Sequence, residues 1–171
     1  MIPLGFGENL IIGVISGIVA SIFFTIILLL VRPKIKVSDK ICCDDNHVYR
    51  IKVVNKTCFM LTNIKYKLYY CRIHGDGITT MEEIQPRKSS PIIHVNKYSI
   101  FDKDANYAFR ISYNIDFEKY PIDRNTKFEF VLIADHSLSN TTKCVNKDYC
   151  GEDIIKGVFE SGQSTKIIRK I

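Results

Sequence analysis

The sequence of 171 residues lacks the common motifs of catalytic sites. It has no G-x-x-x-x-G-K-[ST] loop for phosphates, no G-x-S-x-G turn for a nucleophilic serine and no H-E-x-x-H helix for zinc. The four histidines are scattered through turns and strand ends, where structural roles are more common than general-base roles. We therefore expect a non-enzymatic protein without a cofactor, and an enzyme with an unrecognised site is the least favoured alternative.

The chain contains too few cysteines for a fold held together by disulfide bonds. Six cysteines in 171 residues fall short of the density of small disulfide scaffolds, and no two of them form a C-x-x-C pair. The sequence therefore supports neither a disulfide framework nor a metal site. In a reducing compartment we expect free thiols, some of them packed as small apolar side chains.

Charge is absent from the start of the chain, apart from Glu8, until Arg32. Residues 10–31 are apolar or small, and at 1.5 Å per residue they span the roughly 30 Å hydrocarbon core of a bilayer. A cleaved signal peptide has a shorter apolar stretch behind a basic start, whereas residues 1–9 contain no Lys or Arg. We predict a single transmembrane helix over residues 10–31, preceded by a short extracytoplasmic tail over residues 1–9.

Basic residues on one side of this helix predict its orientation. Arg32, Lys34 and Lys36 follow it, and the other side offers only Glu8. The positive-inside rule then puts the N-terminus outside and the C-terminal domain in the cytoplasm, at the inner membrane of a bacterial cell. We expect the same three basic residues to contact anionic lipid headgroups.

Small residues recur every four positions in the predicted helix, at Gly13, Gly17, Ser21 and Thr25. Such a stripe lets two helix backbones approach closely, and its first two members form a G-x-x-x-G motif. Gly and Ser are also common in membrane helices that do not associate. We favour self-association, and expect this stripe to form the helix interface of a homo-oligomer.

Strand patterns fill the remainder of the chain. Apolar and polar residues alternate at Val48–Asn55, Asn63–Ile73, Tyr107–Asn114 and Lys127–Ala134. Seven or eight short strands without a further helix predict a mainly β fold, an antiparallel sandwich over residues 48–171. Residues 32–47 are expected to form a basic juxtamembrane strand and a linker that lead into the sandwich.

The predicted cytoplasmic part is basic. All 24 Lys and Arg residues and all but one of the 18 Asp and Glu residues follow residue 31, which gives this part a net charge of +7. The charge indicates either a solvated surface or a site for a small anionic ligand, and we do not expect a long nucleic acid as a partner. The candidate ligand residues lie after the strand at 128–134 and on an early strand: His136, Ser137, Ser139, Asn140, Lys143, Arg50 and Lys52.

Two stretches resemble the cytoplasmic region of inward-rectifier potassium channels. Arg32-Pro33-Lys34 is similar to the R-P-K that follows their inner helix and contributes to anionic-lipid binding, and Arg50–Leu68 with Phe128–Phe159 resembles their strands and closing hairpin. The resemblance implies an immunoglobulin-like β-sandwich that assembles around a fourfold axis, as a tetramer. The chain has no pore helix, no selectivity filter and no second membrane helix, so it is not a potassium channel.

The overall architecture, one N-terminal helix and a small β-domain, resembles membrane effectors of bacterial antiphage systems. In effectors of type III CRISPR and cyclic-nucleotide signalling, a cyclic oligonucleotide binds the soluble domain. The resemblance implies an oligomeric membrane effector or sensor in antiviral defence, whose basic domain binds an anionic signal such as a cyclic oligonucleotide or an anionic lipid. The alternative is a membrane-tethered adaptor that binds another protein through an edge of its sheet.

Overall fold

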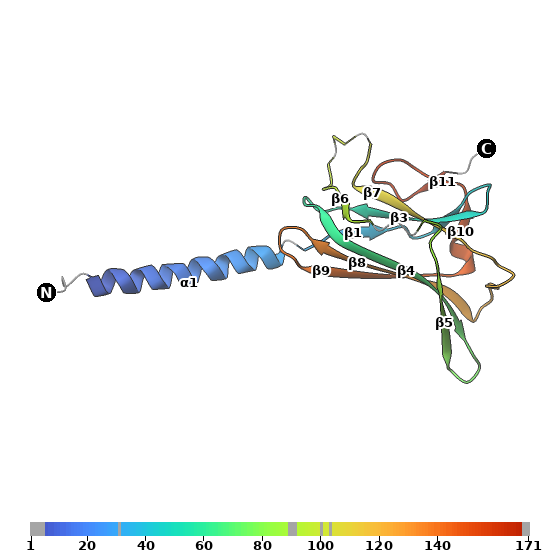
Figure 1. Ribbon diagram of the computed structural model, residues 1–171, viewed down its shortest axis with the longest axis horizontal. Coiled ribbons are helices and arrows are strands. Elements are labelled where there is room, and N and C mark those ends of the chain that lie inside the picture. The colour runs from blue at the N-terminus through green and yellow to red at the C-terminus, as the bar shows by residue number, and fades with distance from the viewer. Residues whose placement is uncertain (1–5, 31, 89–91, 100, 103, 169–171) are drawn as a thin grey trace. The chain divides into compact units, whose positions relative to one another are not determined.

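The structure is a computed structural model that describes residues 6–30, 32–88, 92–99, 101–102 and 104–168 (Figure 1). The chain divides into two compact units, Met1–Arg32 and Pro33–Ile171. The first five residues of the predicted tail and Val31, the last residue of the predicted span, lie outside the described residues.

The first unit contains one helix, α1 (Phe6–Leu30), which begins four residues before the predicted span. Its segment Asn9–Leu28 is long and apolar enough to cross a membrane. Within it, the hydroxyl groups of Ser21 and Thr25 each donate a 2.8 Å hydrogen bond to the carbonyl oxygen four residues earlier. This local bonding satisfies polar groups that hydrocarbon would leave without partners.

The first of two larger sheets in the second unit is built around β3 (Val48–Asn55). Antiparallel to β3 run β1 (Ile35–Val37), β2 (Ile41–Cys43) and β7 (Ala108–Asn114). The short strand β10 (Ile154–Lys156) pairs with β2 in parallel. Seven of the eight residues of β3 are buried, because this strand is covered on both faces.

The second sheet is antiparallel throughout. Its strand order is β5 (Thr79–Ile84), β4 (Leu61–Ile73), β8 (Thr126–His136) and β9 (Thr142–Tyr149), and β6 (His94–Val95) pairs with the start of β4. Along β8, Phe128, Phe130, Leu132 and Ala134 are buried while the residues between them are partly or fully exposed. This alternation is the pattern of a strand with one face on a core.

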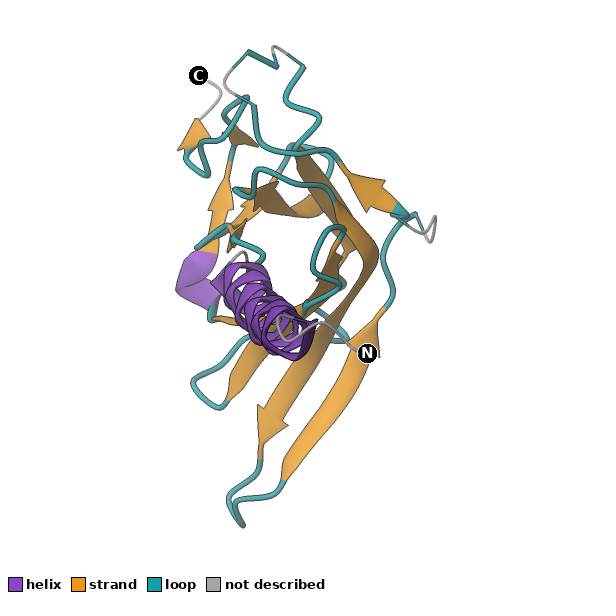
Figure 2. Cartoon of the chain, turned by 90° about the vertical axis from the view of Figure 1, so that its left-hand side faces the viewer, coloured by secondary structure: helices purple, strands orange, loops and turns teal. Residues whose placement is uncertain are grey.

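The two sheets share one core, and they face each other across it in Figure 2. Its largest fully buried side chains are Tyr113, Tyr149, Phe128 and Phe130, drawn from both sheets. Tyr149 donates a 2.8 Å hydrogen bond from its hydroxyl to the carbonyl of Ser38 across this core. The mainly β fold behind one apolar N-terminal helix is thus confirmed.

The C-terminal segment adds small elements to the outside of the first sheet. A 3-10 turn at Gly151–Asp153 precedes β10, and β11 (Val158–Phe159) pairs with β12 (Ile167–Ile168) in a two-stranded ribbon. The sequence predicted a linker up to residue 47, but Ile41–Cys43 forms β2 instead. A buried three-residue strand is too short to show a period in the sequence.

Candidate functional site

Two cations face each other on neighbouring strands of the first sheet. Lys52 of β3 and Arg110 of β7 are directly opposite partners in the antiparallel register. Like charges at such positions repel, because side chains directly across a strand pair are only about 5 Å apart at Cβ. A structure that keeps this pair must offset the repulsion with acceptors or with an anion.

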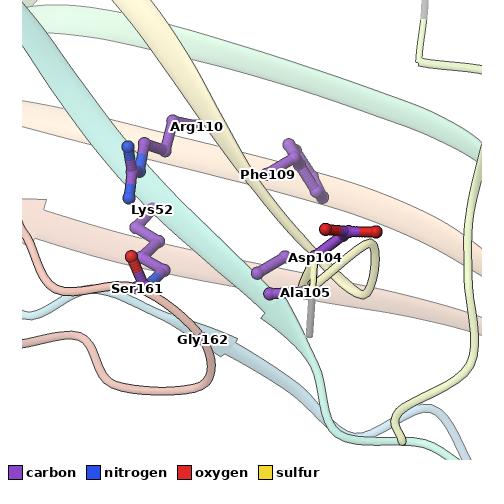
Figure 3. Close-up of a pocket in the computed structure, with 8 residues that line it drawn as sticks. Lys52, Asp104, Ala105, Phe109, Arg110, Ser161 and Gly162 are labelled. Atoms are coloured by element: carbon purple, nitrogen blue, oxygen red, sulfur yellow. The ribbon is translucent and has the colours of Figure 1, made fainter. Parts of the chain in front are cut away.

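A pocket of about 350 Å³ lies beside this pair (Figure 3). Lys52, Arg110 and Ser161 are on one side of it, and Phe109, Asp104 and Ala105 are across from them in Figure 3. The pocket thus combines two basic groups, a hydroxyl and one carboxylate, whereas the ring of Phe109, on the other face of β7 from Arg110, packs against the core. Its walls come from β3, β7, the turn before β7 and the C-terminal segment.

The Lys52 side chain is held by the C-terminal segment. Only 2% of the residue is exposed, and its Nζ donates hydrogen bonds to the carbonyl oxygens of Glu160, at 2.6 Å, and Ser164, at 2.7 Å. An ammonium group has three donors, so these two acceptors leave capacity for one more.

Arg110 binds the same segment. One of its terminal nitrogens donates a 3.2 Å hydrogen bond to the carbonyl oxygen of Phe159, and the residue remains exposed. Lys52 and Arg110 together therefore fasten three backbone carbonyls of residues 159–164 to the outer face of the first sheet. All three acceptors are neutral, and so the positive charge of the pair is left uncompensated by them.

The surroundings lower the pKa of Lys52 to about 8. Burial is the main cause, the Arg110 charge acts in the same direction, and the carboxylate of Glu160 acts weakly against both. With a pKa of about 8 the amine is still mostly protonated at neutral pH. The pocket therefore presents a buried cation that is costly to keep charged without an anionic partner.

His136 is buried rather than exposed on a loop, which corrects the sequence-based prediction. It is the last residue of β8 and has no measurable exposure; its ring packs edge-on against Phe59, with the two centroids 5.2 Å apart. Burial lowers its pKa, and its Nδ1 accepts a 3.1 Å hydrogen bond from the backbone N–H of Ser139. The signal was present in the sequence, because His136 continues the inward alternation of Phe128 to Ala134.

The other loop candidates do lie together, in the turn between β8 and β9. Ser137 and Asn140 are exposed, Ser139 is half-buried beside His136, and Lys143 is exposed near the start of β9. Asn140 has a left-handed backbone, φ 50°, which suits a tight turn and which Asn tolerates. Their part in ligand binding stays a prediction.

Arg50 and Lys52 do not complete a site with this turn. Arg50 forms a 2.6 Å ion pair with Asp44, and Lys52 donates hydrogen bonds to the C-terminal segment. Both residues belong to β3 of the first sheet, whereas the turn joins two strands of the second sheet. The predicted set is thus divided between two sheets. Arg110, the residue that does lie beside Lys52, was not predicted from the sequence.

The remaining predicted residues lie on the helix and directly after it. Lys34 and Lys36 are exposed in and before β1. On α1, a side-chain carbon added at Gly13 or Gly17 would meet nothing within 4 Å, so the chain itself leaves this stripe open. All six cysteines are free thiols, and the described residues contain no group of three or more His, Cys, Asp or Glu that could hold a metal ion.

Comparison with known protein families finds none that matches this chain, and comparison with curated proteins finds no match either. The function must therefore be argued from the chemistry of its residues. The pocket beside Lys52 and Arg110 is lined by the buried cation and is the candidate site.

Proposed function

We propose that this protein is a non-enzymatic, single-span membrane sensor or effector whose β-domain binds a phosphate-bearing anion in the pocket of Lys52 and Arg110. One observation carries the proposal: a buried ammonium group and a guanidinium group lie directly opposite each other, and within the described part of the chain both donate hydrogen bonds to neutral backbone carbonyls and to no carboxylate. An anion between them would relieve their repulsion and supply the third acceptor of Lys52.

The size of the pocket favours a single phosphate group over an extended ligand. At about 350 Å³ it lies at the small end of ligand pockets, which hold roughly 300–1,000 Å³. A nucleotide would place its phosphate between the cations and its base or sugar toward Ala105 and Ala108. A cyclic oligonucleotide would insert one phosphate and leave its remainder on the surface.

The helix and the charge of the domain support the wider proposal. An apolar α1 followed by basic residues favours a cytoplasmic domain at the inner membrane, and the open stripe at Gly13 and Gly17 favours a homo-oligomer. The shared core of two sheets is compatible with the immunoglobulin-like sandwich and fourfold assembly that the channel resemblance implies. A role in antiviral defence is the pathway we propose for such an effector.

Binding of phosphate compounds should depend on both cations. We expect Lys52→Met and Arg110→Gln each to weaken the binding of inorganic phosphate, adenosine monophosphate or cyclic oligoadenylates by roughly 10- to 100-fold, as for a hydrogen bond to a charged group. Isothermal titration of the full chain in nanodiscs measures this. The affinity of the wild type should also fall as pH rises through about 8, because Lys52 loses its charge there.

The matched control is Lys143→Met, which removes an exposed lysine from the turn predicted by sequence. It should leave the affinity unchanged if the pocket is the site. Loss of binding in Lys143→Met but not in Lys52→Met would move the site to the β8–β9 turn. Absence of binding by every compound would favour the adaptor alternative, for which β9 offers an exposed edge strand.

A further inference from the structure

Three large apolar side chains are exposed on two neighbouring turns of the β-domain. Phe59 and Met60, in the loop between β3 and β4, are 36% and 39% exposed, and Leu138, in the turn between β8 and β9, is 52% exposed. The turns are bonded to each other, since the N–H of Ser137 donates a 3.1 Å hydrogen bond to the carbonyl of Met60. We refer to residues 56–60 and 137–140 as the docking turns.

The first of these turns is held in a fixed shape by a buried amide. Asn55 is fully buried, and its Nδ2 donates 2.9 Å hydrogen bonds to the carbonyls of Phe59 and Asn96. Its Oδ1 accepts a 2.8 Å hydrogen bond from the N–H of Thr57. Phe59 and Met60 are therefore exposed in an ordered turn. Moving their side chains into the protein interior would break the hydrogen bonds of Asn55.

The docking turns lie at the end of the domain where the chain arrives from α1. Lys34, at the start of the domain, donates a 2.8 Å hydrogen bond from its N–H to Thr57 Oγ1 and accepts a 2.7 Å hydrogen bond from the N–H of Lys56. The β3–β4 loop and the β8–β9 turn lie at this same end of the domain in Figure 1. Only three residues lie between Leu30, the end of α1, and Lys34, so the four steps along the chain limit the distance between their Cα atoms to about 14 Å.

Charge at this end complements an anionic lipid surface. Lys34 and Lys36 are exposed there, and Lys56 belongs to the first docking turn. The β4–β5 hairpin also exposes an apolar residue, Ile78, but it carries Asp76 and Glu82 and lies at the other end of β4. The thirteen residues of β4 make that distance roughly 40 Å.

We infer that the docking turns are a second membrane-binding element: Phe59, Met60 and Leu138 insert into the headgroup region of the anionic leaflet while neighbouring lysines bind its phosphates. Apolar side chains flanked by lysines are the usual composition of surfaces that lie in this interface. The insertion would fix the orientation of the β-domain on the bilayer. This inference rests on α1 spanning the membrane, and the test separates the two.

The chain contains no tryptophan, so one introduced tryptophan reports on its own position. We would make Phe59→Trp and Leu138→Trp in the full chain, reconstitute them in vesicles with anionic lipid, and compare fluorescence with and without bromine on the acyl chains. Ile78→Trp is the matched control on the far hairpin, and Phe24→Trp reports insertion of α1. We expect brominated lipid to quench Phe59→Trp and Leu138→Trp at least twofold, and Ile78→Trp hardly at all.

Quenching of Phe24→Trp without quenching of Phe59→Trp and Leu138→Trp would overturn the inference and leave the span intact. A blue-shifted but unquenched Leu138→Trp would assign these turns to a contact between protein chains, which also overturns it. Failure of Phe24→Trp to be quenched would contradict the span itself. Vesicles of neutral lipid should weaken the quenching at the docking turns but not at Phe24→Trp, because only the former depends on lipid charge.

Discussion

The triple substitution Ile15→Arg, Ile18→Arg and Ile22→Arg is expected to release the protein from the membrane. These residues lie along the central part of α1, where each arginine costs roughly 2.5–3.5 kcal/mol of insertion free energy. The large apolar residues that remain contribute only about 0.3–0.6 kcal/mol each, so three arginines outweigh them. The fraction of protein that floats with membranes after an alkaline wash measures the effect.

The matched control replaces the same three residues by leucine, which keeps their hydropathy and should leave the protein in the membrane fraction. If the arginine variant remained with membranes as firmly as the leucine variant, α1 would not be the anchor. The docking turns alone would not produce that result, because a few exposed side chains at the interface bind weakly and reversibly compared with a spanning helix.

Lys52→Met should change how the stability of the domain depends on pH. The pKa of the Lys52 amine is about 8 in the folded chain, against an ordinary value of 10.5. Below pH 8 both the folded and the unfolded chain carry the charge, and its burial cost is present in full. Between pH 8 and 10.5 the unfolded chain binds more protons at this group, so the contribution of Lys52 to stability rises with pH.

The free energy of unfolding of the wild type, relative to that of Lys52→Met, should therefore increase by roughly 2–3 kcal/mol between pH 7 and pH 10. Urea unfolding of the full chain in detergent measures both proteins at each pH. Burial raises the pKa values of Tyr113 and Tyr149, which weakens both proteins alike near pH 10 and cancels in the comparison.

Lys127→Met is the control for this experiment. Its hydrogen bond to Asp148 raises the pKa of Lys127, and a raised pKa leaves the stabilisation intact below the ordinary lysine pKa. The difference in the free energy of unfolding between the wild type and Lys127→Met should thus stay constant from pH 7 to about 9.5. If the corresponding difference for Lys52→Met were also constant over this pH range, burial would not destabilise the charged form of the Lys52 amine, and the prediction would be wrong.

Strands with a clear period of two could be predicted from the sequence. The run Val48–Asn55 became β3 with the predicted limits, and Lys127–Ala134 lies inside β8. The short strand β2 could not be predicted, because its three buried residues show no period of two and it is defined only by its pairing with β3 and β10. Local sequence holds no information on such pairings.

The residues of the candidate site could likewise be predicted from the sequence only in part. Lys52 was predicted as a ligand residue from its charge on an early strand, but Arg110 was not, since the two become neighbours only through the register of β3 with β7. Register is set by long-range packing, which one sequence does not display. The burial of His136, in contrast, could have been predicted, because His136 continues the alternation of buried residues from Phe128 to Ala134 that the sequence contains.

The central claim is that Lys52 is the cation that recognises a phosphate group, and the pKa of its amine tests it most directly. Carbon-13 NMR of isotope-labelled lysine in the full chain, assigned with Lys52→Arg, gives this pKa in a buffer free of phosphate. We predict a value of about 8 without ligand, and a value at least one unit higher with saturating adenosine monophosphate, because the bound anion favours the charged amine. An identical pKa of Lys52 with and without the nucleotide would contradict the claim.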